Sequence, residues 1–336
     1  ISSTGDKIGD DVIAMIEKYL DKEIPEVPFA TDSHIGKLID YAQGRNRYIG
    51  HLISIAAHSY KGMNIGLDCA NGSSWMIARS VFNALGANTF VINDTPSGEN
   101  INDNCGSTKI DQLVSLVKEK KLDAGFAFDG DTDRCIAVDE KGNVVDGDAM
   151  LYLLGIYMKD MGILPKSTVV ATVMSNGGFI KSLAKKGISC ELTSVGDRFV
   201  SQKMSEEGYM LGGENSGHII IGKYANTGDG ILTAIMVMEV VMASKKPLSE
   251  LTEELIFYPQ LMESIRVKSP DEAVNDPDVG KLIAELEAGP LKEGRVLLRK
   301  SGTEPVIRIM AEGEREEDVK EAISSIKNMI ERKGHI

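Results

Sequence analysis

The feature of this sequence that most constrains its fold is an alternation of short apolar stretches with longer, helix-periodic stretches, which begins near residue 40. The apolar stretches have the length of strands, and the stretches between them have the periodicity of helices. The predicted strands are MNIGLDC, NTFVIND and LDAGFAF, and the predicted helices are 74–86 and 108–121. Because alternating strands and helices form parallel sheets, we expect a parallel sheet with short loops at the carboxyl ends of its strands.

A second alternation begins near residue 146, and the pattern changes again near residue 258. In the second series, the predicted helices are 148–161, 176–187 and 229–244, and the predicted strands are 167–176 and 188–194. Beyond it, 294–314 is a predicted hairpin of two strands around a polar turn, and 316–333 is a predicted amphipathic helix. This last part is therefore expected to be a small α+β module.

The chain before the first alternation has a predicted helix at 9–21 and then a turn-rich stretch that we interpret as a linker. The predicted fold class is α/β, with two doubly wound α/β domains and a C-terminal α+β domain made of a hairpin sheet with a helix. The predicted boundaries are 1–39 for the end of a first domain and its linker, 40–145 and 146–257 for the α/β domains, and 258–336 for the α+β domain.

The sequence FDGDTDR places Asp129, Asp131 and Asp133 directly after a predicted strand, with Arg134 beside them. Three carboxylates at this spacing repel one another unless a cation lies between them. Hard oxygen ligands suit Mg²⁺ or Ca²⁺, and Mg²⁺ held by few carboxylates usually takes further oxygens from a substrate or a phosphate. Because Arg134 adds a positive charge for a phosphoryl group, the loop is predicted to hold a metal ion against a phosphate.

Two other interpretations of this loop compete with the metal–phosphate site. A calcium EF-hand has acidic residues at the same spacing, but it needs a glycine where Arg134 stands and helices on both sides. The EF-hand is therefore excluded. A solvated acidic turn is the remaining alternative, because turns rich in Asp and Gly are common after strands.

The stretch RKSGTEPVIR, residues 299–308, combines two guanidinium groups, two hydroxyls and a glycine at one predicted hairpin turn. These groups match what a phosphate monoester needs for binding. An ordinary hairpin turn with incidental charge is the alternative. The candidate phosphate-binding residues are Arg299, Ser301, Gly302, Thr303 and Arg308.

The stretch LGGENSGHII, residues 211–220, carries short polar side chains among glycines, which lets them approach a polyhydroxylated ligand closely. A turn stabilised by Asn and Ser, with a structural histidine, is equally open. The candidate substrate-binding residues here are Glu214, Asn215, Ser216 and His218. Asp197 and Arg198 in VGDRF are weaker candidates, because a local salt bridge explains them as well.

The charge balance limits the partners that this chain is expected to bind. Its 37 basic and 50 acidic residues give a net charge of −13, which argues against nucleic acid and against an anionic membrane surface. No apolar run approaches the ~20 residues of a membrane helix. The cysteines form no C-x-x-C pair and no disulfide framework, so the predicted location is the reducing cytoplasm.

Taken together and in order, the three loops resemble those of the α-D-phosphohexomutases. FDGDTDR resembles their metal loop, GGENSGH their sugar-recognition loop and RKSGTEPVIR their phosphate loop. Supporting stretches are LDCANG, VVDGD, TVMSN, VGDRF and TGDG, so that the resemblance covers nearly the whole chain. It is nearest to the bacterial subfamily that interconverts glucosamine 6-phosphate and glucosamine 1-phosphate.

This resemblance implies an isomerase that moves a phosphoryl group by way of a phosphoserine and a sugar bisphosphate, with Mg²⁺ as its cofactor. It places Arg134 at the phosphoryl group in transit, as the catalytic residue, and gives the Mg²⁺ to Asp129, Asp131 and Asp133. The sugar would be bound by Glu214 and Ser216, in a site that also includes Asn215, His218, Asp197 and Arg198. The phosphate that is not reacting would be held by Arg299, Ser301, Gly302, Thr303 and Arg308.

The sequence departs from the family pattern at three places. The subfamily usually has Gln where Asn215 stands and commonly has Pro where Lys300 stands. The family's first domain carries its phosphorylated serine in a Ser-His-Asn-Pro loop, whereas Ser33 and His34 lie in the predicted linker without Asn-Pro. We therefore expect the chain to begin near the end of that first domain, to lack the phosphoryl carrier and to be inactive alone.

Two rival functions stay open at this point: a mutase for glucose or mannose phosphates, and a non-catalytic protein that binds sugar phosphates. The expected partners are a phosphosugar substrate and its bisphosphate intermediate, with no nucleic acid and no membrane. The sequence leaves a homodimer open.

Overall fold

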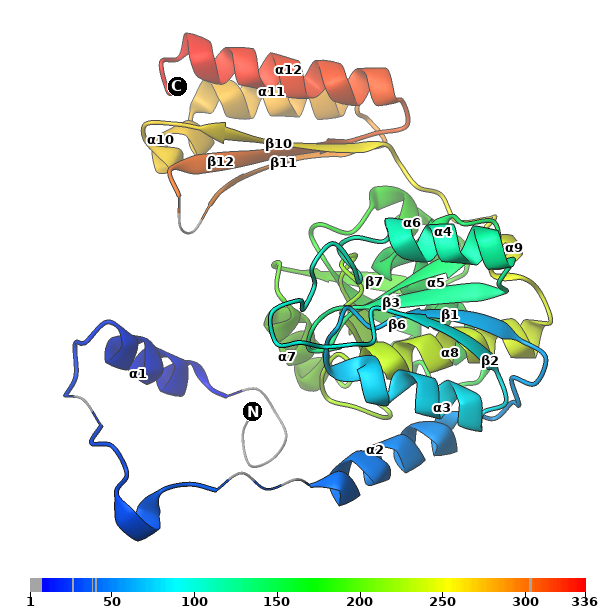
Figure 1. The fold of residues 1–336 in the computed structure, drawn as a ribbon. Coiled ribbons are helices and arrows are strands. Elements are labelled where there is room, and N and C mark those ends of the chain that lie inside the picture. Colours follow the sequence, from blue (N-terminus) through cyan, green and yellow to red (C-terminus); the bar gives the residue numbers. More distant parts are fainter. Residues whose placement is uncertain (1–7, 26, 38, 40, 302–303) are drawn as a thin grey trace. The chain divides into compact units, whose positions relative to one another are not determined.

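The structure is a computed structural model that describes residues 8–25, 27–37, 39, 41–301 and 304–336 (Figure 1). It divides into two compact units, which are described separately. The first unit comprises Ile1–Val173 and Cys190–Glu253, and the second comprises Met174–Ser189 and Glu254–Ile336. Among the described residues, no helix combines the length and the apolar character needed to cross a membrane.

The first sheet of the first unit has the strand order β2-β1-β3-β4-β5. Its strands are β1 (Asn64–Asp68), β2 (Asn88–Ile92), β3 (Ala124–Phe128), β4 (Cys135–Asp139) and β5 (Val144–Val145). The pairs of β1 with β2 and β3 are parallel, as the sequence predicted, but β4 and β5 are antiparallel additions that it did not predict. The chain must turn back after β3, because the connection 129–134 is too short for the crossover that a parallel neighbour needs.

The sequence AGFAF of β3 explains how this sheet is covered on both faces. Successive side chains of a strand point to opposite faces. On one face, Gly125 lies close to Leu113 and Val117 of α4 (Asp111–Lys120). The absence of a side chain at this position lets the helix pack close to the strand. On the other face, Phe126 stacks on Phe82 of α3 (Ala78–Ala84). Strand β3 is therefore buried on both faces, by α4 on one side and by α3 on the other.

The second sheet of the first unit has the order β7-β6-β8-β9. Its strands are β6 (Thr168–Thr172), β7 (Ser189–Thr193), β8 (Leu211–Gly213) and β9 (Ile219–Ile221). Strands β6 and β8 are parallel, and β8 and β9 form an antiparallel hairpin. The remaining helices of this unit are α1 (Asp10–Leu20), α2 (Ala42–Ile55), α5 (Gly147–Asp160), α7 (Asp197–Glu207), α8 (Gly230–Ser244) and α9 (Leu248–Leu251), with short 3₁₀ turns at Asp32–His34, Ser73–Met76 and Pro165–Ser167.

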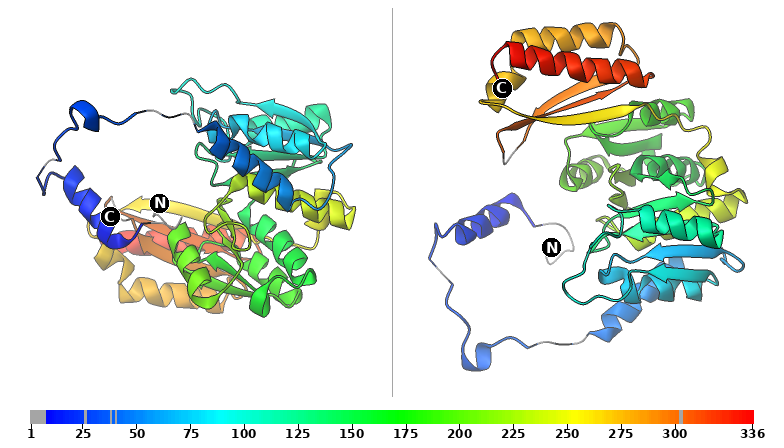
Figure 2. Two further views of the ribbon diagram at one scale, coloured as in Figure 1. Left: turned by 90° about the horizontal axis from the view of Figure 1, so that it is seen from below. Right: turned by 45° about the horizontal axis from the view of Figure 1, so that its top comes forward.

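The second unit contains an antiparallel sheet in the order β10-β12-β11. Its strands are β10 (Gln260–Arg266), β11 (Arg295–Lys300) and β12 (Val306–Glu312), and its helices are α6 (Gly177–Lys185), α10 (Pro270–Val274), α11 (Pro277–Ala288) and α12 (Glu316–Arg332). Helices α11 and α12 cover one face of the sheet (Figures 1 and 2), and isoleucines of α12 pack there against Ile307 and Ile309 of β12. The predicted hairpin and terminal helix are both confirmed, and with them the predicted fold class.

Candidate functional site

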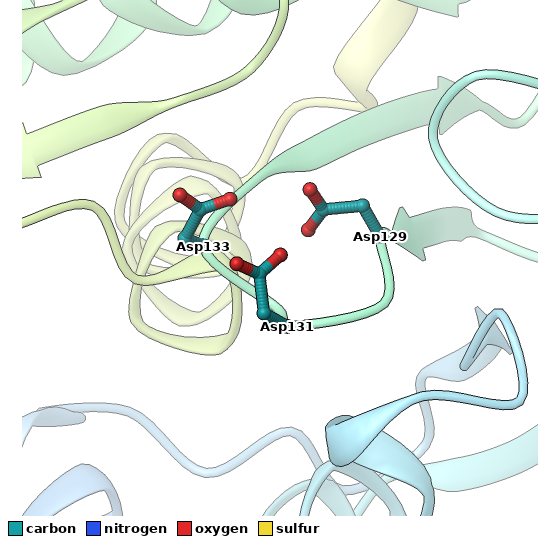
Figure 3. A group of neighbouring side chains, drawn as sticks. All are labelled: Asp129, Asp131 and Asp133. Atoms are coloured by element: carbon teal, nitrogen blue, oxygen red, sulfur yellow. The ribbon is translucent and has the colours of Figure 1, made fainter. Parts of the chain in front are cut away.

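The predicted metal loop is the turn of the β3–β4 hairpin, at the carboxyl end of a buried strand. One carboxylate oxygen from each of Asp129, Asp131 and Asp133 lies within 4.8 Å of the others. Figure 3 shows the three carboxylates gathered around one space. Asp129 is buried at the end of β3, whereas Asp131 is exposed, so the space between them is reached from solvent.

A left-handed residue gives the loop its shape. Thr132 has a φ of 67°, a conformation that is strained for a β-branched residue. Three contacts hold it there: its hydroxyl lies 2.7 Å from that of Ser73, its N–H donates to the carbonyl of Asp129 and its carbonyl accepts from the N–H of Gly230. Residues outside the loop therefore maintain the strained turn, as is common at functional sites.

Burial and charge act on the three carboxylates unequally. Burial, together with the charges of Asp133 and Asp131, raises the pKa of Asp129 to about 6. A hydrogen bond from His218 holds the pKa of Asp133 below its usual value. The guanidinium of Arg134 is only a partial counter-charge, because its Nε lies 3.5 Å from Asp129 Oδ2 and 3.8 Å from Asp133 Oδ1.

The residues of the loop fit a divalent cation with a preference for oxygen ligands. The donor set consists of carboxylates, which suit Mg²⁺, Ca²⁺ or Mn²⁺ better than a soft metal. Within the part of the chain that the structure describes, Asp133 Oδ1 is buried and has no hydrogen-bond partner. A buried, unpartnered carboxylate oxygen is costly unless a cation satisfies it.

The predicted sugar loop is also a hairpin turn, between β8 and β9, and the two turns are joined. Arg134 and His218 form an isolated antiparallel β-bridge, and the N–H of Cys135 donates to the carbonyl of Gly217 at 3.0 Å. Gly217 has a φ of 90°, and a Cβ there would lie 2.0 Å from the carbonyl oxygen of Cys135. The close approach of the two loops therefore requires a glycine at this position.

The polar side chains of the sugar loop differ in their surroundings. His218 is buried, and its Nδ1 lies 3.1 Å from Asp133 Oδ2 while its Nε2 lies 3.5 Å from Asp197 Oδ2. Glu214 is half-buried, and its Oε1 accepts the N–H of Gly196 at 2.9 Å. The backbone carbonyl of Asn215 accepts from Gly147, at the start of α5.

Two of the predicted sugar-site residues are exposed in the structure. Ser216 lies on the surface of the turn. The guanidinium of Arg198 lies 5.4 Å from the centre of the Phe199 ring.

The described residues of the predicted phosphate loop belong to the second unit. Arg299 of β11 and Arg308 of β12 are directly opposite each other, so their side chains lie on the same face. Among the described residues, neither guanidinium pairs with a carboxylate, whereas Lys300 pairs with Asp271 at 2.5 Å. The N–H of Ser301 donates to the carbonyl of Val306, which closes the turn. Gly302 and Thr303 lie outside the described residues.

The structure thus brings the predicted metal ligands, Arg134, His218 and Asp197 into one group in the first unit. Several residues that shape this group were not predicted from the sequence. Gly228 donates its N–H to His218 Nε2, and Gly196 holds Glu214. Each of these glycines precedes an aspartate at the start of a helix, in TGDG and VGDRF. This Gly-Asp sequence is the signal that could have indicated their role.

A cavity of about 250 Å³ adjoins the metal loop and was also not predicted. Asp131, Asp133 and Ser73 line it, together with Asp229 and Tyr48. The hydroxyl of Tyr48 donates to Asp229 Oδ2 at 2.7 Å. Tyr48 stands on α2 in a stretch without any motif, so only the fold reveals its place at the cavity.

The fold and the loop chemistry define a multidomain α/β protein with an acidic metal loop. Its sequence matches three domain models of one family: "phosphoglucomutase/phosphomannomutase, alpha/beta/alpha domain II" over residues 46–142, domain III over 146–257 and the C-terminal domain over 264–328. The chain therefore belongs to the phosphoglucomutase/phosphomannomutase family.

Relatives with high sequence identity carry a more specific name. A phosphoglucosamine mutase of Lachnospira eligens is 52% identical over the whole chain, which spans 74% of that relative. A phosphoglucosamine mutase of Bacillus cereus is 45% identical over 94% of the chain, and the match spans 70% of that relative.

Solved structures confirm the fold at low sequence identity. A phosphoglucomutase/phosphomannomutase family protein from Burkholderia thailandensis matches with a TM-score of 0.73 at 20% identity, covering 96% of this chain and 70% of that one. An N-acetylphosphoglucosamine mutase of Aspergillus fumigatus, solved in complex with GlcNAc-6P and magnesium, matches with a TM-score of 0.70 at 18% identity, covering 85% of this chain and 65% of that one.

Proposed function

We propose that this chain is a phosphoglucosamine mutase, which interconverts glucosamine 6-phosphate and glucosamine 1-phosphate. The observation that carries the proposal is the junction of the acidic loop with the GGENSGH loop through the Arg134–His218 bridge. This junction puts carboxylates suited to a metal ion next to polar groups suited to a sugar. The substrate class is supported by relatives of that name at 45–52% identity.

In this proposal the metal is Mg²⁺, bound by Asp129, Asp131 and Asp133. When bound, Mg²⁺ supplies positive charge that stabilises a phosphoryl group during its transfer. Arg134 is exposed enough to reach solvent, so its guanidinium can turn from the carboxylates toward a phosphoryl group that enters the site. Catalysis then rests on positioning and electrostatics, as is typical of phosphoryl transfer.

Substrate binding is assigned to two further groups of residues. Glu214 and Ser216 bind sugar hydroxyls, with Asn215, Asp197 and Arg198 around them. Glu214 keeps one carboxylate oxygen on Gly196, which fixes the direction of the other. The non-reacting phosphate is assigned to the β11–β12 turn, because an anion between Arg299 and Arg308 relieves the repulsion of their paired charges. This assignment includes Ser301, Gly302 and Thr303.

The test is a binding and turnover experiment with the three 6-phosphates of glucosamine, glucose and mannose. We expect the 336-residue chain to bind glucosamine 6-phosphate most tightly by calorimetry with Mg²⁺ present. We expect conversion, with catalytic bisphosphate added, only in a chain that includes a Ser-His-Asn-Pro loop. Preference for glucose or mannose phosphate would redirect the assignment to the other mutases. Absence of binding to all three would overturn it.

The cellular setting and the assembly are part of the same proposal. We place the enzyme in the cytoplasm, which is supported by the cysteines Cys69, Cys105 and Cys135, because all three are buried as free thiols. The domain boundaries and the homodimer stay predictions.

A further inference from the structure

The β10-β12-β11 sheet of the second unit has one face toward α11 and α12 and a second face that points away from them (Figure 1). Ile265, Ile307 and Leu298 pack with these helices, so the residues that alternate with them lie on the second face. The rows across this second face are Arg266 and Val306, then Ser264, Arg308 and Arg299, then Met262, Met310 and Leu297, and finally Gln260, Glu312 and Arg295. The arginines therefore stand at the two ends of the second face, with an apolar row between them.

The arginine at one end of the second face has a carboxylate partner within the sheet. Arg295 donates from Nε to Glu312 Oε1 at 2.7 Å, and another of its nitrogens donates to the carbonyl of Ser175. Glu312 is buried directly opposite on β12, and its Oε2 accepts from Gln260 at 3.1 Å. A guanidinium group with a structural task is thus neutralised by its neighbours.

The three arginines at the other end of the second face have no such partner. Within the part of the chain that the structure describes, Arg266, Arg299 and Arg308 form no ion pair with a carboxylate, and Asp271 of α10 is taken by Lys300. Arg299 and Arg308 are half-buried, and Arg266 is exposed. Positive charges that are partly withdrawn from water repel one another unless an anion lies among them.

Arg266 is near enough to the hairpin arginines to share an anion with them. Ser264 of β10 is directly opposite Arg308, and Arg266 is the next residue of β10 on the same face. Residues that are diagonal across two antiparallel strands have Cα atoms roughly 7–8 Å apart, which long side chains can span. Ser264 has a short side chain, so it covers little of Arg308. The row geometry therefore lets all three guanidinium groups meet over one place.

We propose that the phosphate site extends from the β11–β12 turn onto β10, where Arg266 supplies a third guanidinium group to the same phosphate monoester. The inference rests on the proposed phosphate-binding role of that turn, and it adds a strand that the turn motif does not contain. The planar fork of a guanidinium group matches two oxygens of a phosphate, so each arginine can hold the anion from a different side.

The experiment titrates inorganic phosphate into the 336-residue chain and follows binding by calorimetry. Chelator is present, so that no cation in the metal loop attracts the phosphate. The ionic strength is about 0.15 M, which screens long-range effects of charge. Arg266→Met removes the guanidinium group, and Arg308→Met reports on the turn site itself. Lys268→Met is the matched control, because Lys268 is exposed two residues further on and its Nζ donates to the carbonyl of Gly334.

We expect Arg266→Met to weaken phosphate binding roughly tenfold, and Lys268→Met to weaken it by less than about twofold. Equal losses in these two variants would overturn the inference, because charge alone would then explain the effect. Wild-type affinity in Arg266→Met, while Arg308→Met loses affinity, would also overturn it and leave the turn site standing. Wild-type affinity in Arg308→Met, or no binding by the wild-type chain, would reject the turn site and the inference with it.

A competing role for Arg266 is protection of an edge strand. Strand β10 lies at the edge of the sheet, and a charged side chain there hinders pairing with another chain. Sedimentation of the same variant distinguishes the two roles. Self-association of Arg266→Met with unchanged phosphate affinity would support edge protection and overturn the inference.

A second variant tests the row geometry without removing an arginine. Ser264→Glu places a carboxylate directly opposite Arg308. Because opposite charges at such positions attract, we expect a higher melting temperature in phosphate-free buffer. The carboxylate also competes with the anion, so we expect phosphate binding to weaken roughly tenfold, as in Arg266→Met. Wild-type phosphate affinity in folded Ser264→Glu would show that the phosphate does not lie over this row, and it would overturn the inference.

Discussion

At the residue scale, Asp131 is the proposed metal ligand whose removal is expected to cost the fold least. Its side chain is exposed and shares the loop with two other carboxylates, so Asp131→Ala removes repulsion without leaving a buried group unpaired. We expect at least a tenfold loss of Mg²⁺ affinity, loss of turnover in a chain that carries the serine loop, and an unchanged melting temperature in chelator. Calorimetry and thermal unfolding check this, with Glu119→Ala, an exposed helical position, as the control. Full activity at saturating Mg²⁺ would remove Asp131 from the site.

The raised pKa of Asp129 predicts how the metal-free protein responds to pH. A carboxyl group whose pKa rises on folding, here from 3.8 to about 6, stabilises the fold at low pH, and this contribution is lost as the pH passes through that window. We expect Asp129→Asn, which cannot ionise, to melt increasingly above the wild type as the pH rises from about 4 to about 7. Added Mg²⁺ should remove the difference or reverse it. A difference in melting temperature that does not vary with pH would contradict the assignment.

At the element scale, the β11–β12 hairpin carries two arginines opposite each other. Like charges at such positions destabilise a hairpin unless an anion lies between them. We expect Arg308→Met to leave the melting temperature unchanged or slightly higher in phosphate-free buffer, and to lose most of the stabilisation that added phosphate gives the wild type. Arg332→Met, at the exposed end of α12, is the control for general charge effects. An equal response of both variants to phosphate would argue against a site at the hairpin.

The sequence allowed many of the elements with strong periodicity to be predicted, but it did not predict the short strands β8 and β9 or the antiparallel strands β4, β5 and β10. Strands β1, β2, β3 and β6 are apolar runs and were predicted correctly. Strands β8 and β9 have three residues each and were interpreted as parts of a loop, because LGG and III are too short to show a period. The β8–β9 hairpin therefore became visible only in the structure, whereas the longer β11–β12 hairpin was predicted.

Residues of the candidate site that lie together in one local motif were predictable, whereas contacts between residues far apart in the sequence were not. The spacing of Asp129, Asp131 and Asp133 predicts their convergence, because one turn carries them all. The hydrogen bond between His218 and Asp133 joins residues far apart in the sequence, and no local pattern encodes it. The same holds for Tyr48 and Asp229, which meet across the fold.

At the scale of the whole molecule, two helices join the sheets of the first unit into one body. Helix α8 contacts β3 and β4 of the first sheet and β9 of the second, and α5 packs against strands of both sheets and against α8. The sequence of α8 is apolar on nearly all sides, which is expected of a helix buried between layers. The metal loop and the sugar loop therefore belong to one compact unit, although they come from different family domains.

A single buried carboxylate on α8 tests this view of the first unit. Glu239 is 2% exposed and accepts hydrogen bonds from the backbone N–H groups of Ala57 and His58, from the His58 ring and from the Tyr60 hydroxyl. Glu239→Ala leaves these donors unpaired, which costs roughly 3 kcal/mol. In a unit of this size, that loss lowers the melting temperature by roughly 6–12 °C.

Calorimetric unfolding is the measurement, because it can record the unfolding transitions of the two units separately. Because all partners of Glu239 lie in the first unit, we expect its unfolding transition to shift and that of the second unit to stay in place. Glu239→Gln keeps a carbonyl oxygen for the backbone donors and should shift the transition less. If α8 did not join the two sheets, Glu239→Ala would instead split the transition of the first unit in two, with the first sheet unfolding before the second.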